Sequence, residues 1–396
     1  MISSAVMMTQ EPDDTGFIPA TLNAITADWL TRALHRVGLL KRARVVAIEV
    51  QPVAAGGGFV GQTARLIIEY NEREGGAPAS LFVKLSSADP AVREQLRKAG
   101  LYETEAGLYR DLAPRPDFPL SVPRPYLSLY NARTSECLLL LEDLGQAEFG
   151  DDLTGCSSTD AIVVVRQLGL LHAHFWGASH LKQWSWLRSL TEEAEVRIAL
   201  YRGIFPRFEQ RCSHFLPPGV LETARRFALL LPTYIERMVD RPQTLTHGDF
   251  RADNFAFATT GGERRVTVFD WQVARRAPGP RDVAYFLSLS LTVEQRRLTE
   301  ASLLKLYHET LGAHGVVGYS PEDLRADPAG FLSGEPRSTR WPSGGHDPGG
   351  VCESVRSHAA HEDSGDDRET SRTPAGARKG HQGKGCEGTE WHRGFR

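Results

Sequence analysis

The sequence has few cysteines, and their spacing does not suggest a metal site. Five occur in 396 residues, and no two form a CxxC pair: Cys137, Cys156, Cys212, Cys352 and Cys386. Residues 1–8 contain too short an apolar run for a secretory signal. We therefore expect free thiols in a reducing cytoplasm, and neither a disulfide framework nor a cysteine-bound metal.

Long apolar runs and an excess of one charge are also missing. No stretch approaches the roughly 18 consecutive apolar residues of a membrane span, so no membrane partner is expected. The 46 basic and 49 acidic residues leave a net charge of -3, which does not suggest nucleic acid as a partner. Nothing in the composition sets the oligomeric state. The length allows two domains, or two lobes and a tail.

The most informative stretch is Thr246-His247-Gly248-Asp249-Phe250-Arg251-Ala252-Asp253-Asn254, followed downstream by Val268-Phe269-Asp270-Trp271. Residues 255–258 and 266–269 are strand-like and flank the turn residues 259–262, which predicts a β-hairpin. Because facing residues at the open end of a hairpin lie about 5 Å apart, Asn254 and Asp270 should converge. One amide oxygen and one carboxylate suit Mg²⁺, and Asp249 should lie beside the same ion.

Upstream of this stretch the pattern predicts a small sheet. Thr26 is a plausible N-cap of a helix that ends before Gly38. Predicted strands at residues 45–53 and 63–70 flank a turn that contains Gly56, Gly57 and Gly58. Glycines at such a place let backbone N–H groups approach phosphates, but glycines in a hairpin turn are more often ordinary turn residues. The turn alone does not decide between the two.

A third predicted strand, residues 81–85, carries Lys84 among apolar neighbours. This lysine either reaches past the sheet into solvent or is held to pair with phosphate. The helix that begins at Tyr102 contains Glu105, which is either an exposed residue of the first turns or the partner of Lys84. The amino-terminal lobe of kinases has the same order of elements: a strand, a glycine-rich turn, a second strand, a third strand that carries a lysine, and a helix that carries a glutamate.

The middle of the chain predicts a hinge. Residues 114–125 are rich in proline and should form a surface loop. The unbroken apolar run of residues 137–141 indicates a strand buried on both faces. It ends at Glu142-Asp143-Leu144-Gly145, whose backbone groups are placed to take up an adenine edge, although Glu142 and Asp143 also suit an ordinary loop.

Helices dominate from residue 158 onward. A helix over residues 161–176, capped by Ser158-Thr159-Asp160, has too many apolar positions for the surface and should form the spine of a second lobe. His172 and His174 fall on different faces of it, so we interpret both as structural. The tryptophans that follow, Trp176, Trp184 and Trp186, either line a pocket for an apolar substrate or simply pack. Further helices are predicted at residues 192–201 and at residues 219–239, the latter interrupted by Pro232.

Several motifs in this order resemble one kinase superfamily. They are His247-Gly248-Asp249 followed by Asn254, Leu140-Leu141-Glu142-Asp143-Leu144, Phe149-Gly150-Asp151, Phe269-Asp270-Trp271-Gln272 and Gly279-Pro280-Arg281-Asp282-Val283-Ala284-Tyr285-Phe286-Leu287. Together they resemble the aminoglycoside phosphotransferase and choline kinase-like superfamily, and within it the ecdysteroid-kinase-like branch. The resemblance covers about residues 26–324 and depends on the conjunction of the motifs, since HGD alone is a common tripeptide.

The resemblance implies an α+β, two-lobed, protein-kinase-like fold. A small antiparallel-sheet lobe would take residues 21–142, and a mainly helical lobe residues 143–326. The cofactors would be ATP and Mg²⁺, and the reaction the transfer of the γ-phosphate to a hydroxyl of a small molecule.

The resemblance also implies a role for each candidate residue. Asp249 would be the catalytic base, and Asn254 and Asp270 would hold Mg²⁺. Lys84, steadied by Glu105, would contact the nucleotide phosphates. The turn with Gly56, Gly57 and Gly58 would close over these phosphates, and Glu142 and Leu144 would lie at the adenine edge. His247 would orient the loop, Asp282 would brace it, and Asp253 would be a solvated loop acid.

Two departures from protein kinases bear on the substrate. Asp270 is followed by Trp271 and not by Phe-Gly, and no activation segment ending in Ala-Pro-Glu follows, which favours a small molecule over a protein substrate. The tryptophans favour a fairly apolar one. Two alternatives remain open at this point: a nucleotide-binding pseudoenzyme or interaction protein, and a metal-dependent hydrolase that uses only Asp249, Asn254 and Asp270.

Both ends of the chain differ from the rest. Residues 1–20 are weakly patterned and predict a flexible lead-in. Helical patterning continues through residues 291–317, with Leu298 and Leu303 among the side chains expected to pack, but the apolar pattern stops near Asp327. Residues 327–396 should be disordered, since they cannot bury enough apolar surface to offset chain entropy. A shifted reading frame would explain the abrupt change, and would leave the second lobe without helices that relatives carry.

Overall fold

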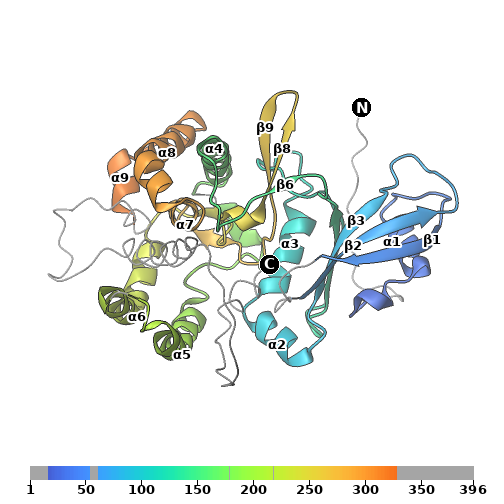
Figure 1. The fold of residues 1–396 in the computed structure, drawn as a ribbon, viewed down its shortest axis with the longest axis horizontal. Coiled ribbons are helices and arrows are strands. Elements are labelled where there is room, and N and C mark those ends of the chain that lie inside the picture. Colours follow the sequence, from blue (N-terminus) through green and yellow to red (C-terminus); the bar gives the residue numbers. More distant parts are fainter. Residues whose placement is uncertain (1–16, 54–60, 178, 217, 328–396) are drawn as a thin grey trace, which may run out of the picture.

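The computed structural model describes residues 17–53, 61–177, 179–216 and 218–327. Figure 1 shows a β-sheet lobe, blue to cyan, beside a helical lobe, green to orange, with helix α3 between them. The fold class predicted from the sequence, α+β with a small antiparallel sheet and a mainly helical second lobe, is confirmed. The glycines at positions 56–58 and the segment after Asp327 lie outside the described residues.

The sheet of the first lobe has five antiparallel strands in the order β1-β2-β3-β5-β4. Their bounds are Val45–Pro52 for β1, Gly61–Tyr70 for β2, Ser80–Ser86 for β3, Pro125–Tyr130 for β4 and Cys137–Glu142 for β5. Helix α1, Ala27–Arg36, covers one face, and its cap is as predicted because the Thr26 hydroxyl accepts a hydrogen bond from the Trp29 amide. The register places Lys84 opposite Thr63 on one side and Leu139 on the other.

Strand β5 separates two hydrophobic cores. Leu138 and Leu140 face the core shared with α1, whereas Cys137, Leu139 and Leu141 face the larger core of α3 and the helical lobe. Because successive side chains of a strand point to opposite faces, a strand between two cores must be apolar at every position. The prediction that this strand is buried on both faces is confirmed.

Helix α3, Leu101–Asp111, joins the two lobes. A β-carbon on Gly107 would lie 2.4 Å from the ring of Trp186, so only glycine lets the indole lie against the helix. The Trp186 Nε1–H also donates to Asp111 at 2.7 Å. Trp186 is therefore a packing residue, and only 3% of it is exposed. Helix α2, Pro90–Lys98, precedes α3 and was not predicted from the sequence.

The helical lobe is built around α4. The helices are α4 Ser158–His174, α5 Ala194–Cys212, α6 Pro218–Val239, α7 Pro280–Leu289, α8 Val293–Ala313 and α9 Pro321–Ala326, and short 3-10 helices span Leu22–Ala24, Ser179–Gln183 and Ala252–Asn254. Helix α4 begins three residues earlier than predicted, because Ser157 and not Ser158 caps it by accepting a hydrogen bond from the Asp160 amide. Its packing against α8 and the larger core confirms it as the spine of the lobe.

Three further sequence predictions about the helices are wrong. Helix α6 continues through Pro232, because Leu231 and Ile235 on either side of it are buried and hold both turns in place. Helix α5 runs to Cys212, well beyond the predicted end at residue 201. Leu298 is 77% exposed, since the buried face of α8 follows Leu303, Tyr307 and Leu311 at four-residue spacing.

The predicted hairpin is present as β8, Phe255–Thr260, and β9, Glu263–Val268. Gly261 and Gly262 form its two-residue turn with φ of +61° and +83°, as such a tight turn requires. β6, Glu148–Phe149, extends this pair to three strands, while β7, Thr244–Thr246, pairs with β10, Arg275–Ala277. In the part of the chain that the structure describes, no helix has both the length and the apolarity to cross a membrane.

Candidate active site

The loop from His247 to Asn254 connects β7 to β8 and is held in place by Asp282 of α7. One oxygen of this buried carboxylate accepts a hydrogen bond from the His247 amide at 2.6 Å, and the other accepts one from the Gly248 amide at 3.0 Å. Gly248 has φ of +84°, and a β-carbon there would lie 2.3 Å from the Val273 carbonyl oxygen. Asp282 thus braces the loop, in the position that the sequence suggested for it.

His247 fixes the loop from within. Its ring is buried, and Nδ1 accepts a hydrogen bond from the Asp249 amide at 3.2 Å. The other nitrogen, Nε2, lies 2.9 Å from the Phe269 carbonyl oxygen and must donate to it, which assigns the ring proton to Nε2. The imidazole therefore links Phe269, which precedes Asp270, to the backbone of Asp249.

The brace itself has support from α4 and α8. His172 Nε2 lies 3.6 Å from Asp282, and His172 Nδ1 lies 2.8 Å from the Tyr307 hydroxyl. Burial alone would raise the pKa of Asp282, but the side chains of His172, His247 and Arg281 beside it outweigh burial, so this pKa lies below its usual value. A β-carbon on Gly279 would lie 2.6 Å from both His172 Nδ1 and the Tyr307 oxygen, so the motif requires a glycine there. His172 is structural, as predicted.

Across from this loop, Lys84 lies between two carboxylates. Its Nζ is 2.8 Å from Glu105 Oε2 and 2.6 Å from Asp270 Oδ1. Burial would lower the pKa of Lys84, but the carboxylates of Asp270 and Glu105 outweigh it and raise this pKa. Burial raises the pKa of Glu105, against the opposing charge of Lys84. The structure thus shows Glu105 as the partner of Lys84 and not as an exposed residue, and it shows the Lys84 ammonium held in an ion pair; contact of Lys84 with phosphate stays a prediction.

Asp270 has an uncommon backbone conformation. Its φ is +63°, a region that residues other than glycine seldom occupy and that is often found at functional positions. Just before it, the Phe269 amide donates to the Asn254 carbonyl at 3.1 Å, which closes the open end of the hairpin. Asn254 is thus hydrogen-bonded to the residue that precedes Asp270, so the two ends of the hairpin converge as predicted.

Asn254 is oriented by Asp249. Its Nδ2 donates to the Asp249 carbonyl at 2.8 Å and to Asp249 Oδ2 at 3.1 Å. These bonds occupy the amide nitrogen of Asn254, so its Oδ1 points away from Asp249. An amide oxygen and the Asp270 carboxylate are oxygen donors of the kind that Mg²⁺ takes together with phosphate and water, so the residues present fit this ion. The described residues contain no group of three or more His, Cys, Asp or Glu side chains arranged to hold a metal ion.

Two residues at the site were not predicted from the sequence. Arg251 lies 2.7 Å from Asp152, 3.3 Å from Asp253 and 3.4 Å from Asp249, so it links the loop to the chain that follows the hinge. The Tyr285 hydroxyl hydrogen-bonds Asp249 from α7, and burial is the main cause of its raised pKa. The three-residue spacing from Asp282 was the signal for Tyr285, because it places both on one side of α7.

Asp253 and the hinge residues have local partners. Asp253 is not simply solvated, because its Oδ1 accepts from the Asp152 amide at 3.0 Å. At the hinge, a Glu142 carboxylate oxygen accepts from the Arg124 amide at 3.1 Å, and the Leu144 carbonyl accepts from the Ala147 amide at 2.7 Å. The hinge is therefore an ordered connection, and Leu144 is half-buried there.

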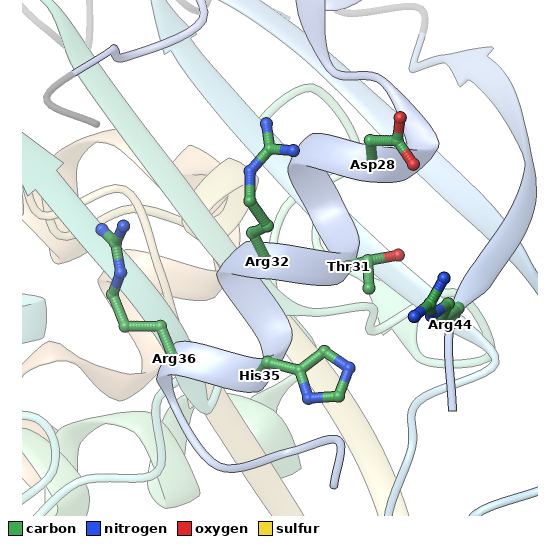
Figure 2. Close-up of a pocket in the computed structure, with 6 residues that line it drawn as sticks. All are labelled: Asp28, Thr31, Arg32, His35, Arg36 and Arg44. Atoms are coloured by element: carbon green, nitrogen blue, oxygen red, sulfur yellow. The ribbon is translucent and has the colours of Figure 1, made fainter. Parts of the chain in front are cut away.

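A separate hollow of about 650 Å³ lies on α1, lined by Asp28, Thr31, Arg32, His35, Arg36 and Arg44 (Figure 2). Two of these residues have structural hydrogen bonds: the Thr31 hydroxyl accepts one from the Val45 amide, and His35 Nε2 forms one with the Ala43 carbonyl. Helix α1 packs on the face of the sheet opposite to the one from which Lys84 reaches Glu105. This hollow is therefore not part of the site around Lys84.

Comparisons with known proteins show the family of the chain. Residues 55–315 match the ecdysteroid kinase-like family, and the chain belongs to that family. No curated protein is detectably similar in sequence. Among solved structures, the choline kinase from Cryptosporidium parvum Iowa II is similar with a TM-score of 0.48 and 10% identity, over 85% of this chain and 95% of that one. A putative aminoglycoside phosphotransferase from Ralstonia eutropha JMP134 gives a TM-score of 0.44 and 16% identity, over 84% and 97%.

Proposed function

We propose that this protein transfers the γ-phosphate of ATP, bound with Mg²⁺, to a hydroxyl group of a small molecule. The observation that carries the proposal is the Glu105–Lys84–Asp270 chain of ion pairs, which joins the sheet lobe to the segment that follows β9. A lysine between a helix glutamate and the metal-binding aspartate is the arrangement that phosphoryl transfer needs for the nucleotide phosphates.

Each residue then has a role that its geometry supports. Asp249 accepts the proton of the attacking hydroxyl, and its amide is fixed by His247. Asn254 Oδ1 and Asp270 hold Mg²⁺, which neutralises charge on the phosphates when it is bound. Lys84 binds the α- and β-phosphates, with Glu142 and Leu144 at the adenine edge. Such a site accelerates transfer mainly by positioning groups and by stabilising charge.

A thermal-shift titration with Mg²⁺ and ATP tests the binding step. A ligand at 100 times its Kd should add about 2.7 kcal/mol to the free energy of unfolding. The absence of any shift would remove the nucleotide from the proposal. Hydrolysis that proceeds with metal but without a nucleotide requirement would favour the metal-dependent hydrolase instead.

Turnover is tested by ADP release over a panel of hydroxylated metabolites, with wild type and Asp249→Ala side by side. Loss of a positioned base should slow transfer by about 10²–10⁴-fold. Asp240→Ala is the matched control, because Asp240 is exposed at the end of α6. An unchanged rate in Asp249→Ala would reassign the base, and ATP binding without turnover on any acceptor would favour the pseudoenzyme.

A further inference from the structure

Helix α7 presents a second residue on the side from which Tyr285 reaches Asp249. Arg281 lies in the first turn of α7, four residues before Tyr285, so both share one face of the helix. One turn separates them, which is about 5.4 Å along the helix axis. Arg281 is therefore a near neighbour of the place where a hydroxyl must approach Asp249.

Arg281 is unusual because its charge is not paired. Its Nη1 is buried and has no hydrogen-bond partner among the described residues, and no carboxylate there lies within ion-pair distance of it. The charge of Arg281 opposes the burial that raises the pKa of Tyr234 on α6, and it adds to the burial that lowers the pKa of Arg197 on α5. Buried polar groups of charged side chains nearly always have a partner, and one that lacks it points to a ligand.

The neighbouring charges do not supply that partner. Glu193 Oε2 lies 2.7 Å from Arg197 but also 2.5 Å from the buried Arg275, so one carboxylate serves two guanidinium groups. Arg275 in turn lies beneath the loop, with Nε 3.3 Å from the position of a β-carbon on Gly248. Asp282, next to Arg281, already has both oxygens occupied by loop amides.

Two further acids face this region: Asp249, which lies beside Arg251, and the buried Asp327, whose charge acts on the same Tyr234 as the charge of Arg281. Burial and the repulsion from Arg281 lower the pKa of Arg197, although Glu193 opposes both. Such repulsion is expected where guanidinium groups lie close together and outnumber the carboxylates that could pair with them. A substrate with an ammonium group would be repelled here, whereas an anion would be attracted.

We propose that Arg281 and Arg197 bind an anionic group of the acceptor, so that the substrate is an alcohol that also carries a carboxylate or a phosphate. The anionic group lies about one helical turn, roughly 5 Å along α7, from the hydroxyl that is phosphorylated. Arginine suits this task because its planar guanidinium binds both oxygens of such a group. The inference rests on the proposed transfer to a hydroxyl, and it replaces the apolar acceptor that the tryptophans suggested.

Binding of inorganic sulfate tests the site without knowledge of the substrate. At constant ionic strength, sulfate should raise the Tm of the full chain saturably, and Arg281→Gln should weaken its affinity by roughly tenfold to a hundredfold, as expected for hydrogen bonds to a charged group. Arg281→Lys, which keeps the charge, should retain a saturable response. The control is Arg207→Gln, at an exposed position of α5, the helix that also carries Arg197; this variant should match wild type.

Two results would overturn the inference. One is a sulfate response equal in wild type and Arg281→Gln, which would reduce it to a general salt effect. The other is a response retained in Arg281→Gln but lost in Lys84→Met, which would place the anion on the nucleotide side of the site.

Matched acceptor pairs extend the test to turnover: glucuronate against glucose, and glycerol 3-phosphate against glycerol. The inference expects ADP release only with anionic members, and the pair that responds distinguishes carboxylate from phosphate. Equal kcat/KM for a neutral partner would overturn it while leaving the proposed function intact. A chain that shows no shift with Mg²⁺ and ATP would overturn the proposed function, whether or not it binds sulfate.

Discussion

The two halves of the site are held together in different ways. In one half, Lys84 is positioned by two side-chain carboxylates, Glu105 and Asp270. In the other half, the loop from His247 to Asn254 is positioned by bonds to its own backbone, from Asp282 and from the His247 ring. One half depends on charge and the other on hydrogen bonds to amides.

This difference suits two different tasks. A cation that binds phosphate must be able to exchange a carboxylate partner for a phosphate oxygen, and an ion pair between side chains allows that. A base must stay at one angle to the attacking hydroxyl, and bonds to backbone amides leave it little freedom. We therefore expect the charged half to respond to pH through Glu105 and the loop half to respond through Asp282.

The largest effect is expected for Lys84→Met. Loss of the charge that stabilises the phosphates should lower the transfer rate by about 10²–10³-fold. It also leaves Glu105 buried without its cation, which should lower the free energy of unfolding by about 3 kcal/mol at pH 8. Because burial raises the pKa of Glu105, this carboxyl takes up a proton at lower pH, so the loss of stability should be smaller at pH 5.

Urea denaturation at both pH values measures this, with Lys305→Met as control, since Lys305 is exposed on α8. A loss of stability that does not depend on pH would mean that Glu105 is not the group left unpaired.

A smaller effect, on stability, is expected for Asp282→Asn. The amide has only one oxygen for the two loop N–H groups, so the variant should lose about 2–3 kcal/mol of unfolding free energy at pH 7. The pKa of Asp282 is lowered in the folded state, so its contribution to stability is present above the usual pKa of an aspartate and is lost as the pH falls through the lower pKa of the folded state. Wild type and variant should therefore converge in acid.

Denaturation from pH 7 to pH 3 compares Asp282→Asn with Asp240→Asn at the exposed end of α6. A constant difference over that range would show that the charge of Asp282 does not brace the loop.

The smallest effect is expected for Tyr285→Phe. Only one hydrogen bond to Asp249 is removed, so kcat should fall by roughly 2–10-fold, with Tm nearly unchanged. Steady-state kinetics and thermal melting measure both quantities, and a change in Tm without a change in kcat would make Tyr285 a packing residue only.

Much of the fold followed from local pattern. The cap at Thr26, the two-glycine turn of the hairpin and the strand of residues 137–141 were predicted because each depends on residues close in sequence. The loop from His247 to Asn254 was also found in this way. Its chemistry is concentrated in nine consecutive residues, from Thr246 to Asn254.

The errors occurred where distant contacts decide. Pro232 was expected to interrupt α6, but the buried neighbours Leu231 and Ile235 keep the helix continuous. Leu298 was expected to pack, but only the docking of α8 on α4 determines which of its apolar positions face inward. Arg251 was missed because its partner Asp152 lies 99 positions away in the chain.

The sequence by itself determined the order of strands and helices and the chemistry of the Asp249 loop, because backbone propensity, capping and turn geometry act over a few residues. Only the tertiary structure decided that Lys84 and Glu105 form an ion pair, since their 2.8 Å contact joins residues 21 positions apart across a strand and a helix. It also decided that Nη1 of Arg281, one helical turn from Tyr285, is buried without a hydrogen-bond partner among the described residues. Charge pairing depends on distance in space, and that distance exists only once the helices have packed.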